Sequence, residues 1–382
     1  MNYNERALEL HKKMKGKIEV VSKVPLATQE DLSISYTPGV AEPCREIAKD
    51  KENVYIYTSK GNMVAVVSDG SAVLGLGNIG PEAALPVMEG KAILFKQFAG
   101  VDAFPICLNT QDTEEIIQIC KALEPSFGGI NLEDISSPRC FEIEERLKKE
   151  LSIPVFHDDQ HGTAIVVLAG LMNALKLVSK DIGSIKIVIA GAGAAATAIA
   201  KLLVGAGAKN IILCDSKGVL SSQRSDLDDH KKSLLSFSNP HQESGTLSDA
   251  MEKADVFIGV STANIITRDE VKKMAEKAIV FAMSNPNPEI SPEEAKAGGA
   301  AIVATGRSDF PNQLNNVLVF PGIFKGALSI RSHITEEMKM AAAQALADMV
   351  GTATAEKIIP HPLDPGVADK VAEAVVNVSQ KS

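Results

Sequence analysis

The segment 185–203 reads IKIVIAGAGAAATAIAKLL, and it decides the fold of the second half of the chain. Its first part, Ile185–Ala190, is an apolar run rich in β-branched residues, as a buried parallel strand requires. An alanine-rich helical pattern then continues to Leu203 and stops in Gly205–Gly207. Further apolar runs follow at Asn210–Cys214, Val256–Val260, Ile279–Met283 and Ala301–Ala304. Strands that alternate with helical stretches predict an α/β fold with a doubly wound parallel sheet.

A glycine-rich turn joins the first strand to the helix. It reads Gly191-Ala192-Gly193-Ala194-Ala195-Ala196, which has the form G-x-G-x-x-A. Gly191 permits a tight turn, Gly193 lets the backbone approach a pyrophosphate, and Ala196 allows the helix to pack closely on the strand. The first N–H groups of the helix and its positive dipole end would face the phosphates. The turn therefore predicts a dinucleotide site in a Rossmann-like domain.

Asp215 ends the next strand, near the separation of about 20 residues at which an acid meets the adenosine ribose in such sites. A carboxylate there accepts hydrogen bonds from the ribose hydroxyls and repels a 2′-phosphate, which favours NAD. Ser216 and Lys217 follow directly and could soften that preference, so NAD and NADP both stay open. The alternative is a glycine turn without a ligand, and the agreement of strand, helix and acid disfavours it.

A second match to the same pattern, Gly75–Gly80, reads GLGNIG. It is followed by Pro81 and Pro86, which are expected to leave no room for a long uninterrupted helix. We interpret it as a loop that bends the backbone beside the active site, and not as the main cofactor cradle.

The first half predicts a separate α/β unit. Its expected strands are Asn62–Val67, Ile93–Phe95 and Phe104–Cys107, and its expected helices are Glu114–Ala122 and Cys140–Glu150. We place the boundary near Gly162, between an N-terminal catalytic domain (1–161) and an NAD(P)-binding domain (162–382), with the helix Ala164–Leu175 bridging them. Two amphipathic helices, Thr335–Met349 and Ala368–Val378, could pack back across the first domain. The polar segment Ser216–Asp249 is expected to be an irregular surface excursion with helical pieces.

The composition excludes several classes of protein. With 382 residues, 45% of them hydrophobic, and a net charge of -9, the chain can bury two cores but lacks the positive charge that nucleic acid or an anionic membrane requires. Its five cysteines show no CxxC spacing, so neither a disulfide framework nor a zinc knuckle is indicated, and a reducing cytoplasm fits best. Met1–Leu10 has no apolar core of a secretion signal, and no uninterrupted apolar stretch reaches the roughly 18 residues of a membrane span.

Two pairs of acids each follow an apolar run: Glu133-Asp134 follows Gly129–Leu132, and Asp158-Asp159 follows Ile153–Phe156. Adjacent side chains in a strand point to opposite faces, so both members of a pair can face one ion only at a strand end or in a loop. Converging carboxylates there suit a hard divalent cation, Mg²⁺ or Mn²⁺. Helix caps and surface charges are the alternative. His157 and His161 lie four residues apart, but without cysteine or a third histidine zinc is less favoured.

Two further residues are candidates for acid–base chemistry. Lys91 precedes the apolar run Ala92–Phe95 and is expected to face the interior, where burial near a metal would lower its pKa and make it a base. Tyr36 lies in the turn-like stretch Ser35–Gly39, and its phenol can act as an acid. From spacing alone, a surface lysine and a packed tyrosine would be the favoured interpretations.

Taken together, these stretches resemble the malic enzymes, in their compact bacterial form, over essentially the whole chain. The matching segments are Ser35–Cys44 (SYTPGVAEPC), Val66–Pro81 (VVSDGSAVLGLGNIGP), Gly90–Lys96 (GKAILFK), Phe127–Asp134 (FGGINLED), Phe156–Ala164 (FHDDQHGTA), Gly191–Ala196, Ser284–Glu289 (SNPNPE), Thr305–Asn316 (TGRSDFPNQLNN) and Phe320–Gly326 (FPGIFKG). So many motifs in one order are highly specific.

The resemblance assigns a role to each candidate residue. It implies Tyr36 as general acid and Lys91 as general base, with Asp158 supporting the lysine. It also implies metal ligands and residues that hold the substrate and the nicotinamide; these are Glu133, Asp134 and Asp159 for the metal, and Asn285, Asn315 and Asn316 for substrate and nicotinamide. Larger malic enzymes carry an arginine for a substrate carboxylate where this chain has Ala72, so another group would take that role.

The implied reaction is the metal-dependent oxidative decarboxylation of (S)-malate to pyruvate and CO₂ with reduction of NAD⁺ or NADP⁺. A malolactic conversion with retained NAD, and a catalytically silent NAD-binding regulator, are the alternatives; the intact acid–base and metal residues speak against the second. The resemblance also suggests a homodimer with the N-terminal segment at its interface, and it leaves open which subunit Tyr36 serves.

Overall fold

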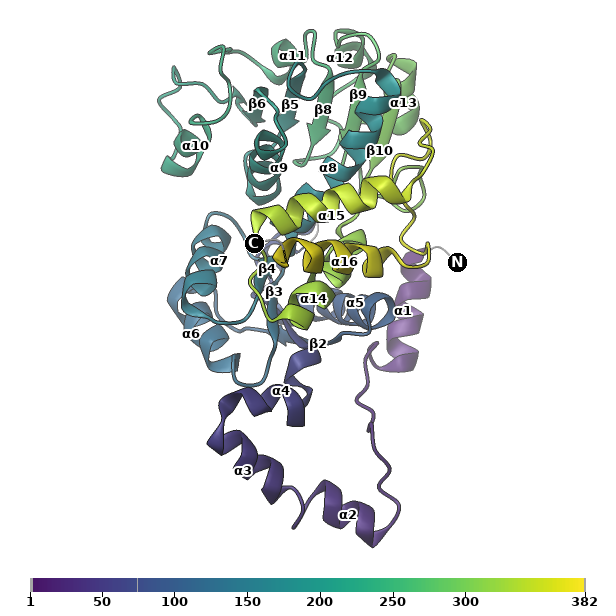
Figure 1. Ribbon diagram of the computed structural model, residues 1–382. Coiled ribbons are helices and arrows are strands. Elements are labelled where there is room, and N and C mark those ends of the chain that lie inside the picture. The colour runs from purple at the N-terminus through teal and green to yellow at the C-terminus, as the bar shows by residue number, and fades with distance from the viewer. Residues whose placement is uncertain (1–2, 74, 381–382) are drawn as a thin grey trace.

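The computed structural model describes residues 3–73 and 75–380 and arranges them around two β-sheets, one in each half of the chain (Figure 1). The predicted α/β fold is confirmed, because helices alternate with parallel strands in both halves. Leu74, which belongs to the Val66–Pro81 stretch, lies outside the described residues, as do the first two residues of Met1–Leu10.

The first sheet has four parallel strands in the order β2-β1-β3-β4. The strands are β1 (Met63–Ser68), β2 (Asp102–Cys107), β3 (Gly129–Leu132) and β4 (Val155–His157). The helices that connect them are α5 (Pro81–Ala99), α6 (Thr113–Leu123) and α7 (Arg139–Glu150). Because all four strands run the same way, their carboxyl ends share one edge, and both acid pairs follow strands that end there.

Helix α5 corrects two expectations. Ile93–Phe95, expected as a strand, lies inside this helix, and Pro86 does not end it. Pro81 occupies the first turn, where a missing N–H is harmless. The helix continues past Pro86 because residues that face the core recur at helical spacing: Ala84, Met88, Lys91, Ala92, Phe95 and Ala99.

Helix α8 (Asp158–Val178) joins the two halves, as the predicted bridging helix does, but it begins earlier, directly at the second acid pair. Among the described residues it alone is long and apolar enough to cross a membrane by length and composition. Most of its residues are instead buried inside the protein, against α9 and α15, as in the core helix of a globular domain.

The second sheet has six strands in the order β10-β9-β8-β5-β6-β7. They are β5 (Lys186–Ala190), β6 (Asn210–Asp215), β7 (Gly218–Val219), β8 (Val256–Gly259), β9 (Ile279–Ala282) and β10 (Ile302–Thr305). All pair in parallel except the short edge strand β7. The chain leaves β5 to one side and returns on the other, so the glycine turn lies at the switch point where such sheets bind ligands. The sheet's helices are α9 (Ala194–Gly205), α10 (Asp229–Leu234), α11 (Leu247–Ala250), α12 (Arg268–Lys272) and α13 (Pro292–Ala297).

Three C-terminal helices complete the fold: α14 (Phe320–Ile330), which lies against the first half beside α5, α15 (Glu336–Met349) and α16 (Val367–Ser379) (Figure 1). Helices α14 and α16 pack against α5 of the first half, in line with the expectation for the last helix. Helix α15 packs against α8 and α16 instead. Since the second half of the chain thus contributes to the core of the first, the boundary near Gly162 stays a prediction.

Residues 3–57 form an N-terminal arm, in which α1 lies beside α5 while α2 and α3 extend away from the sheets (Figure 1). It contains α1 (Tyr3–Met14), α2 (Gln29–Ser35), α3 (Ala41–Lys49) and α4 (Val54–Tyr57), none of which has a buried residue. Most of the large exposed apolar side chains described in the protein lie on this arm. A surface of this kind is rare on a monomer and is typical of a protein interface.

Candidate active site

The two acid pairs meet at the carboxyl edge of the first sheet. Strands β3 and β4 are neighbours, with Leu132 opposite His157, so Glu133 and Asp158 follow paired residues. Oxygen atoms of Glu133, Asp134 and Asp159 lie within 4.8 Å of one another. The structure therefore brings the three predicted metal ligands together.

The local backbone explains how two adjacent acids can face one point. Asp134 has a φ of 55°, which turns the chain directly after the strand. Its N–H donates to Asp159 Oδ2 over 2.8 Å, and its carbonyl accepts from Ala72 N over 2.9 Å. These bonds join the ends of β3 and β4 to the loop that follows β1.

Lys91 lies beside the acids and is 8% exposed, so its expected burial is confirmed. Its Nζ donates to Asp158 Oδ2 and lies 3.0 Å from Glu133 Oε1. The ring of Phe320 on α14 covers it, with the ring centroid 4.3 Å from Nζ. The predicted pairing of Lys91 with Asp158 is thus present in the geometry.

The electrostatics of this cluster differ from the expectation for Lys91. Burial lowers the pKa of Lys91, but the charges of Asp158, Glu133 and Asp159 outweigh burial and raise it above its usual value. Burial also raises the pKa of Glu133 well above its usual value, and the neighbouring carboxylates add to that rise. One lysine faces four carboxylates, so the cluster carries excess negative charge.

These groups fit a divalent cation. The donors that converge are all carboxylate oxygens, which Mg²⁺ and Mn²⁺ prefer. Asp158 Oδ1 is buried and has no hydrogen-bond partner among the described residues. A cation would offset the charge that the single lysine leaves uncompensated.

Gly162 makes room for the first turn of α8. A Cβ atom there would lie 1.9 Å from Asp158 Oδ1 and 2.9 Å from the Cβ of Asn316. Asn315 caps the short 3-10 helix Asn316–Leu318, because its Oδ1 accepts from Val317 N over 2.9 Å. The predicted Asn316 therefore lies close to Asp158, the partner of Lys91, and Asn315 precedes it at the helix cap.

The second glycine pattern also lies at the site. A Cβ on Gly75 would lie 2.4 Å from the carbonyl oxygen of Asn285, so this loop contacts the predicted substrate- and nicotinamide-binding asparagine. A long helix does follow Gly80, contrary to expectation. The pattern nevertheless lacks the geometry of a cofactor cradle, because twelve residues (69–80) lie between the end of β1 and the start of α5, too many for a tight strand-to-helix turn.

The glycine turn has the expected strand-to-helix geometry. Gly191 has a φ of 138°, which favours glycine, and a Cβ there would lie 2.9 Å from the carbonyl oxygen of Val260. Helix α9 begins at Ala194. Gly193 faces the first half of the chain, since its Cβ position lies 3.7 Å from Ser137 Oγ.

The glycine turn lies next to the end of β6, where Asp215 stands, because Gly191 N donates to Cys214 O over 2.8 Å. The Asp215 carboxylate is held by Arg224 and Lys231, which the sequence pattern did not indicate.

Buried Glu289 is another residue that the sequence pattern did not single out. It accepts from Ser261 N and Ser284 N, each over 3.0 Å, and so joins the loops after β8 and β9.

Tyr36 is not brought to the cluster. It caps the end of α2 on the N-terminal arm and is 67% exposed, and α2 lies apart from α5, which carries Lys91 (Figure 1). The chain therefore presents the phenol to solvent and not to the acids.

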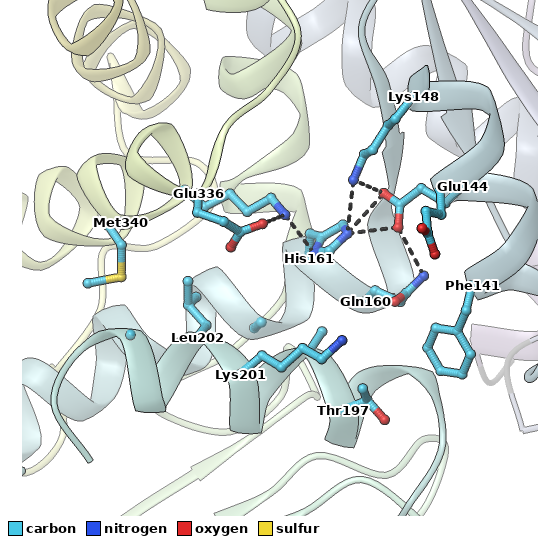
Figure 2. Close-up of a pocket in the computed structure, with 15 residues that line it drawn as sticks. Phe141, Glu144, Lys148, Gln160, His161, Thr197, Lys201, Leu202, Glu336 and Met340 are labelled. Carbon is cyan, nitrogen blue, oxygen red and sulfur yellow. Dashed lines mark hydrogen bonds and ion pairs between the residues drawn. The ribbon is translucent and has the colours of Figure 1, made fainter. Parts of the chain in front are cut away.

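A cavity of about 520 Å³ lies behind the acids, between α7, α8, α9 and α15 (Figure 2). At its wall, Glu144 is 5% exposed and accepts from His157 N over 3.1 Å and from Lys148 Nζ over 2.6 Å. Its carboxylate also lies 2.9 Å from His161 Nε2 and accepts from Gln160 Nε2 over 3.3 Å. Glu144 thus holds the start of α8 from the side opposite Lys91, and the sequence did not single it out.

Comparison with known proteins matches both halves. The family model "Malic enzyme, N-terminal domain" matches residues 15–148, and "Malic enzyme, NAD binding domain" matches residues 160–380. The bifunctional malic/malolactic enzyme of Bacillus subtilis is 58% identical over 100% of this chain and 94% of its own length. The NAD-dependent malic enzyme of Geobacillus stearothermophilus is 56% identical over 100% of this chain and 80% of its own length. The crystal structure of the NAD-dependent malic enzyme of Thermotoga maritima is 53% identical, with a TM-score of 0.94 over 97% of this chain and 98% of that one.

Proposed function

The chain belongs to the malic enzyme family and is an NAD(P)-dependent oxidoreductase, and on this premise we propose that it converts (S)-malate to pyruvate and CO₂ while reducing NAD⁺ or NADP⁺. One observation carries the proposal: buried Lys91 is paired with Asp158 beside three converging carboxylates, at the edge that faces the Asn285 loop. A base and a cation site side by side are what this reaction requires.

Glu133, Asp134 and Asp159 would hold Mg²⁺ or Mn²⁺. When bound, the cation would act as a Lewis acid for the charge that develops as CO₂ leaves, and it would offset the carboxylate charge that raises the pKa of Lys91. Asn131 fixes one of these ligands, because its Nδ2 donates to Glu133 Oε2 over 2.9 Å.

Lys91 acts as the base in this proposal. Its Nζ takes the proton of the C2 hydroxyl while hydride passes from C2 to the nicotinamide. Asp158 and Glu133 fix the position of Nζ, and the Phe320 ring excludes water from one side of it. Asn285, Asn315 and Asn316 would hold the substrate and the nicotinamide ring.

Tyr36 acts as the acid that protonates C3 of the enol form of pyruvate, and we assign it to the site of a second copy of the chain. Two observations support a homodimer that uses the arm as its interface: the phenol is exposed, and the arm carries most of the large exposed apolar side chains. A two-fold dimer would bury that surface and complete both sites at once. We place this dimer in the cytoplasm.

Initial rates with malate, Mn²⁺ and either NAD⁺ or NADP⁺ test the proposal. NAD(P)H should form only with malate and the cation, and full activity in EDTA would overturn it. Lys91→Ala should lower kcat by about 10²-fold or more. Lys96→Ala is the matched control, because Lys96 is exposed on the same helix and pairs with Asp102.

A malolactic conversion is the second candidate, because a relative at 58% identity is named as a bifunctional malic/malolactic enzyme. Lactate as product without net NADH would identify it. Binding of NAD(P)H without turnover of malate to either product would leave only the silent regulator.

A further inference from the structure

Both carboxylate oxygens of Asp215, at the end of β6, already accept two hydrogen bonds each. Its Oδ1 accepts from Lys217 N over 2.9 Å and from Arg224 NH1 over 2.7 Å. Its Oδ2 accepts from Arg224 NH2 over 3.0 Å and from Lys231 Nζ over 2.8 Å. A carboxylate offers about four lone-pair sites, so a ribose hydroxyl can bind only by displacing one of these donors.

The ion-pair network that includes Asp215 carries a net positive charge, and Asp228 stands beside it, accepting from the backbone N of Lys231 over 2.8 Å. Arg224 also forms an ion pair with Asp226 over 2.9 Å, and the Lys217 ammonium pairs with Asp226 over 2.7 Å. Three cations therefore face two carboxylates. Burial would raise the pKa of Asp215, but the hydrogen bonds from Arg224, Lys231 and Lys217 N outweigh it and lower that pKa to about 2, so the charges persist near neutral pH.

This cluster lies at the adenosine end of the cofactor site. The glycine turn bonds to the residue before Asp215, and α10, which carries Lys231, contacts α9 where His230 Nε2 lies 3.1 Å from Thr197 Oγ1. Figure 1 shows α10 on the same side of the sheet's edge as β6 and α9. A 2′-substituent on the ribose would meet these cations first.

We propose that Lys231 and Arg224 form a subsite for the 2′-phosphate of the dinucleotide, so that the chain uses NADP as well as NAD, with Lys231 as the residue that decides. This inference rests on the proposed function only in its choice of ligand. A phosphate can take Lys231 from Asp215 because, among the described residues, the Lys231 ammonium pairs with Asp215 alone, while Arg224 stays bound to Asp226. With NAD, a ribose hydroxyl replaces Lys231 on Oδ2 and nothing else moves.

Fluorescence titration of the full chain with NADPH and NADH, without malate or metal, tests the assignment. The wild-type protein should bind both. Lys231→Ala should weaken NADPH binding about tenfold or more and leave NADH within about twofold, because one charge-assisted hydrogen bond to the phosphate is lost. Lys231→Arg should restore NADPH binding.

Lys232→Ala is the matched control, because the neighbouring lysine is exposed and pairs with Asp229. It should leave both affinities unchanged. Three results would each overturn the subsite: no NADPH binding by the wild type, equal weakening of both nucleotides by Lys231→Ala, or the same loss in Lys232→Ala.

The titration separates the two proposals. Protein that binds NADPH through Lys231 but never turns over malate would refute the proposed function alone. An enzyme active with NAD⁺ that does not bind NADPH would refute the subsite alone.

Discussion

Replacing Glu144 by Gln should destabilise the protein by about 2 kcal/mol. The carboxylate accepts from four donors and is almost fully buried, and Gln offers a single acceptor oxygen of the same shape. Hydrogen bonds to charged groups contribute about 1.5–3 kcal/mol each. Lys148 is partly exposed and can turn to water, and the Gln oxygen still accepts from part of the remaining donors, so the loss stays near the value of about one such bond.

The same change should weaken Mn²⁺ binding. Glu144 holds His157 N, Gln160 and His161, which flank Asp158 and Asp159 at the start of α8. Supporting groups of this kind typically change metal affinity by about 10–100-fold, and about tenfold is expected because Glu144 acts on the backbone and not on a ligand. Urea unfolding gives the first quantity, and electron paramagnetic resonance of free Mn²⁺ gives the second.

Glu145→Gln is the matched control, since Glu145 is the next residue on α7, is exposed and pairs with Lys149. Its effect on stability should stay within about 0.5 kcal/mol. Unchanged stability together with unchanged Mn²⁺ affinity in Glu144→Gln, or equal effects in both variants, would refute the reasoning.

The pH dependence gives a further check on Glu144. Burial would raise its pKa, but His161, Lys148 and His157 outweigh burial and hold it well below the usual 4.5. A carboxyl with a depressed folded-state pKa contributes its full stability above the unfolded value and loses it as pH falls toward the folded value. The stability difference between wild type and Glu144→Gln should therefore be constant above about pH 5 and shrink only in more acidic solution.

Two other changes test the site more directly. Gly162→Ala places a methyl group against Asp158 Oδ1; because Asp158 is the partner of Lys91, its displacement should lower kcat by about tenfold or more. Gly205→Ala on α9 is the control, since a Cβ there meets nothing within 4 Å, and it should leave kcat unchanged. Co-expressed Tyr36→Phe and Lys91→Ala chains should recover about a quarter of wild-type activity if Tyr36 acts across the interface. Half of the dimers are then mixed, and one of the two sites in each mixed dimer contains both an intact Tyr36 and an intact Lys91. No recovery in isolated mixed dimers would place the tyrosine in its own subunit's site.

The second half of the fold was readable because its pattern is local. Ile185–Ala190, the glycine turn and the alanine-rich helix occur in order, and each agrees with the next. Helix α5 was missed for a physical reason: Pro86 and the run Ala92–Phe95 are typical of a break and a strand, and only packing against α14 and β2 decides for the helix.

The residues of the site also differ in how clearly the sequence indicates them. The acid pairs could be predicted because residues after neighbouring parallel strands must share an edge. Glu144 had a weaker signal, an acid inside the buried stripe Cys140, Ile143 and Leu147 of α7, which is where a buried polar network would be sought. The cations on Asp215 had none, because Arg224 and Lys231 reach it from an irregular excursion whose path no sequence period fixes.

The contacts between the halves explain why the cofactor and the acids face each other. Gly193, in the turn of the second sheet, lies against Ser137, which follows β3 of the first, and Gly75, which follows β1, lies against Asn285, which follows β9. Both contacts join loops at the carboxyl ends of strands, so the ligand-binding edges of the two sheets are opposed. Helix α8 fixes that opposition, because it begins at Asp158 on the first edge and leads directly into β5. Hydride transfer between a substrate on one edge and a nicotinamide on the other would then depend on α8 being held at its start, where Glu144 accepts from His157 N.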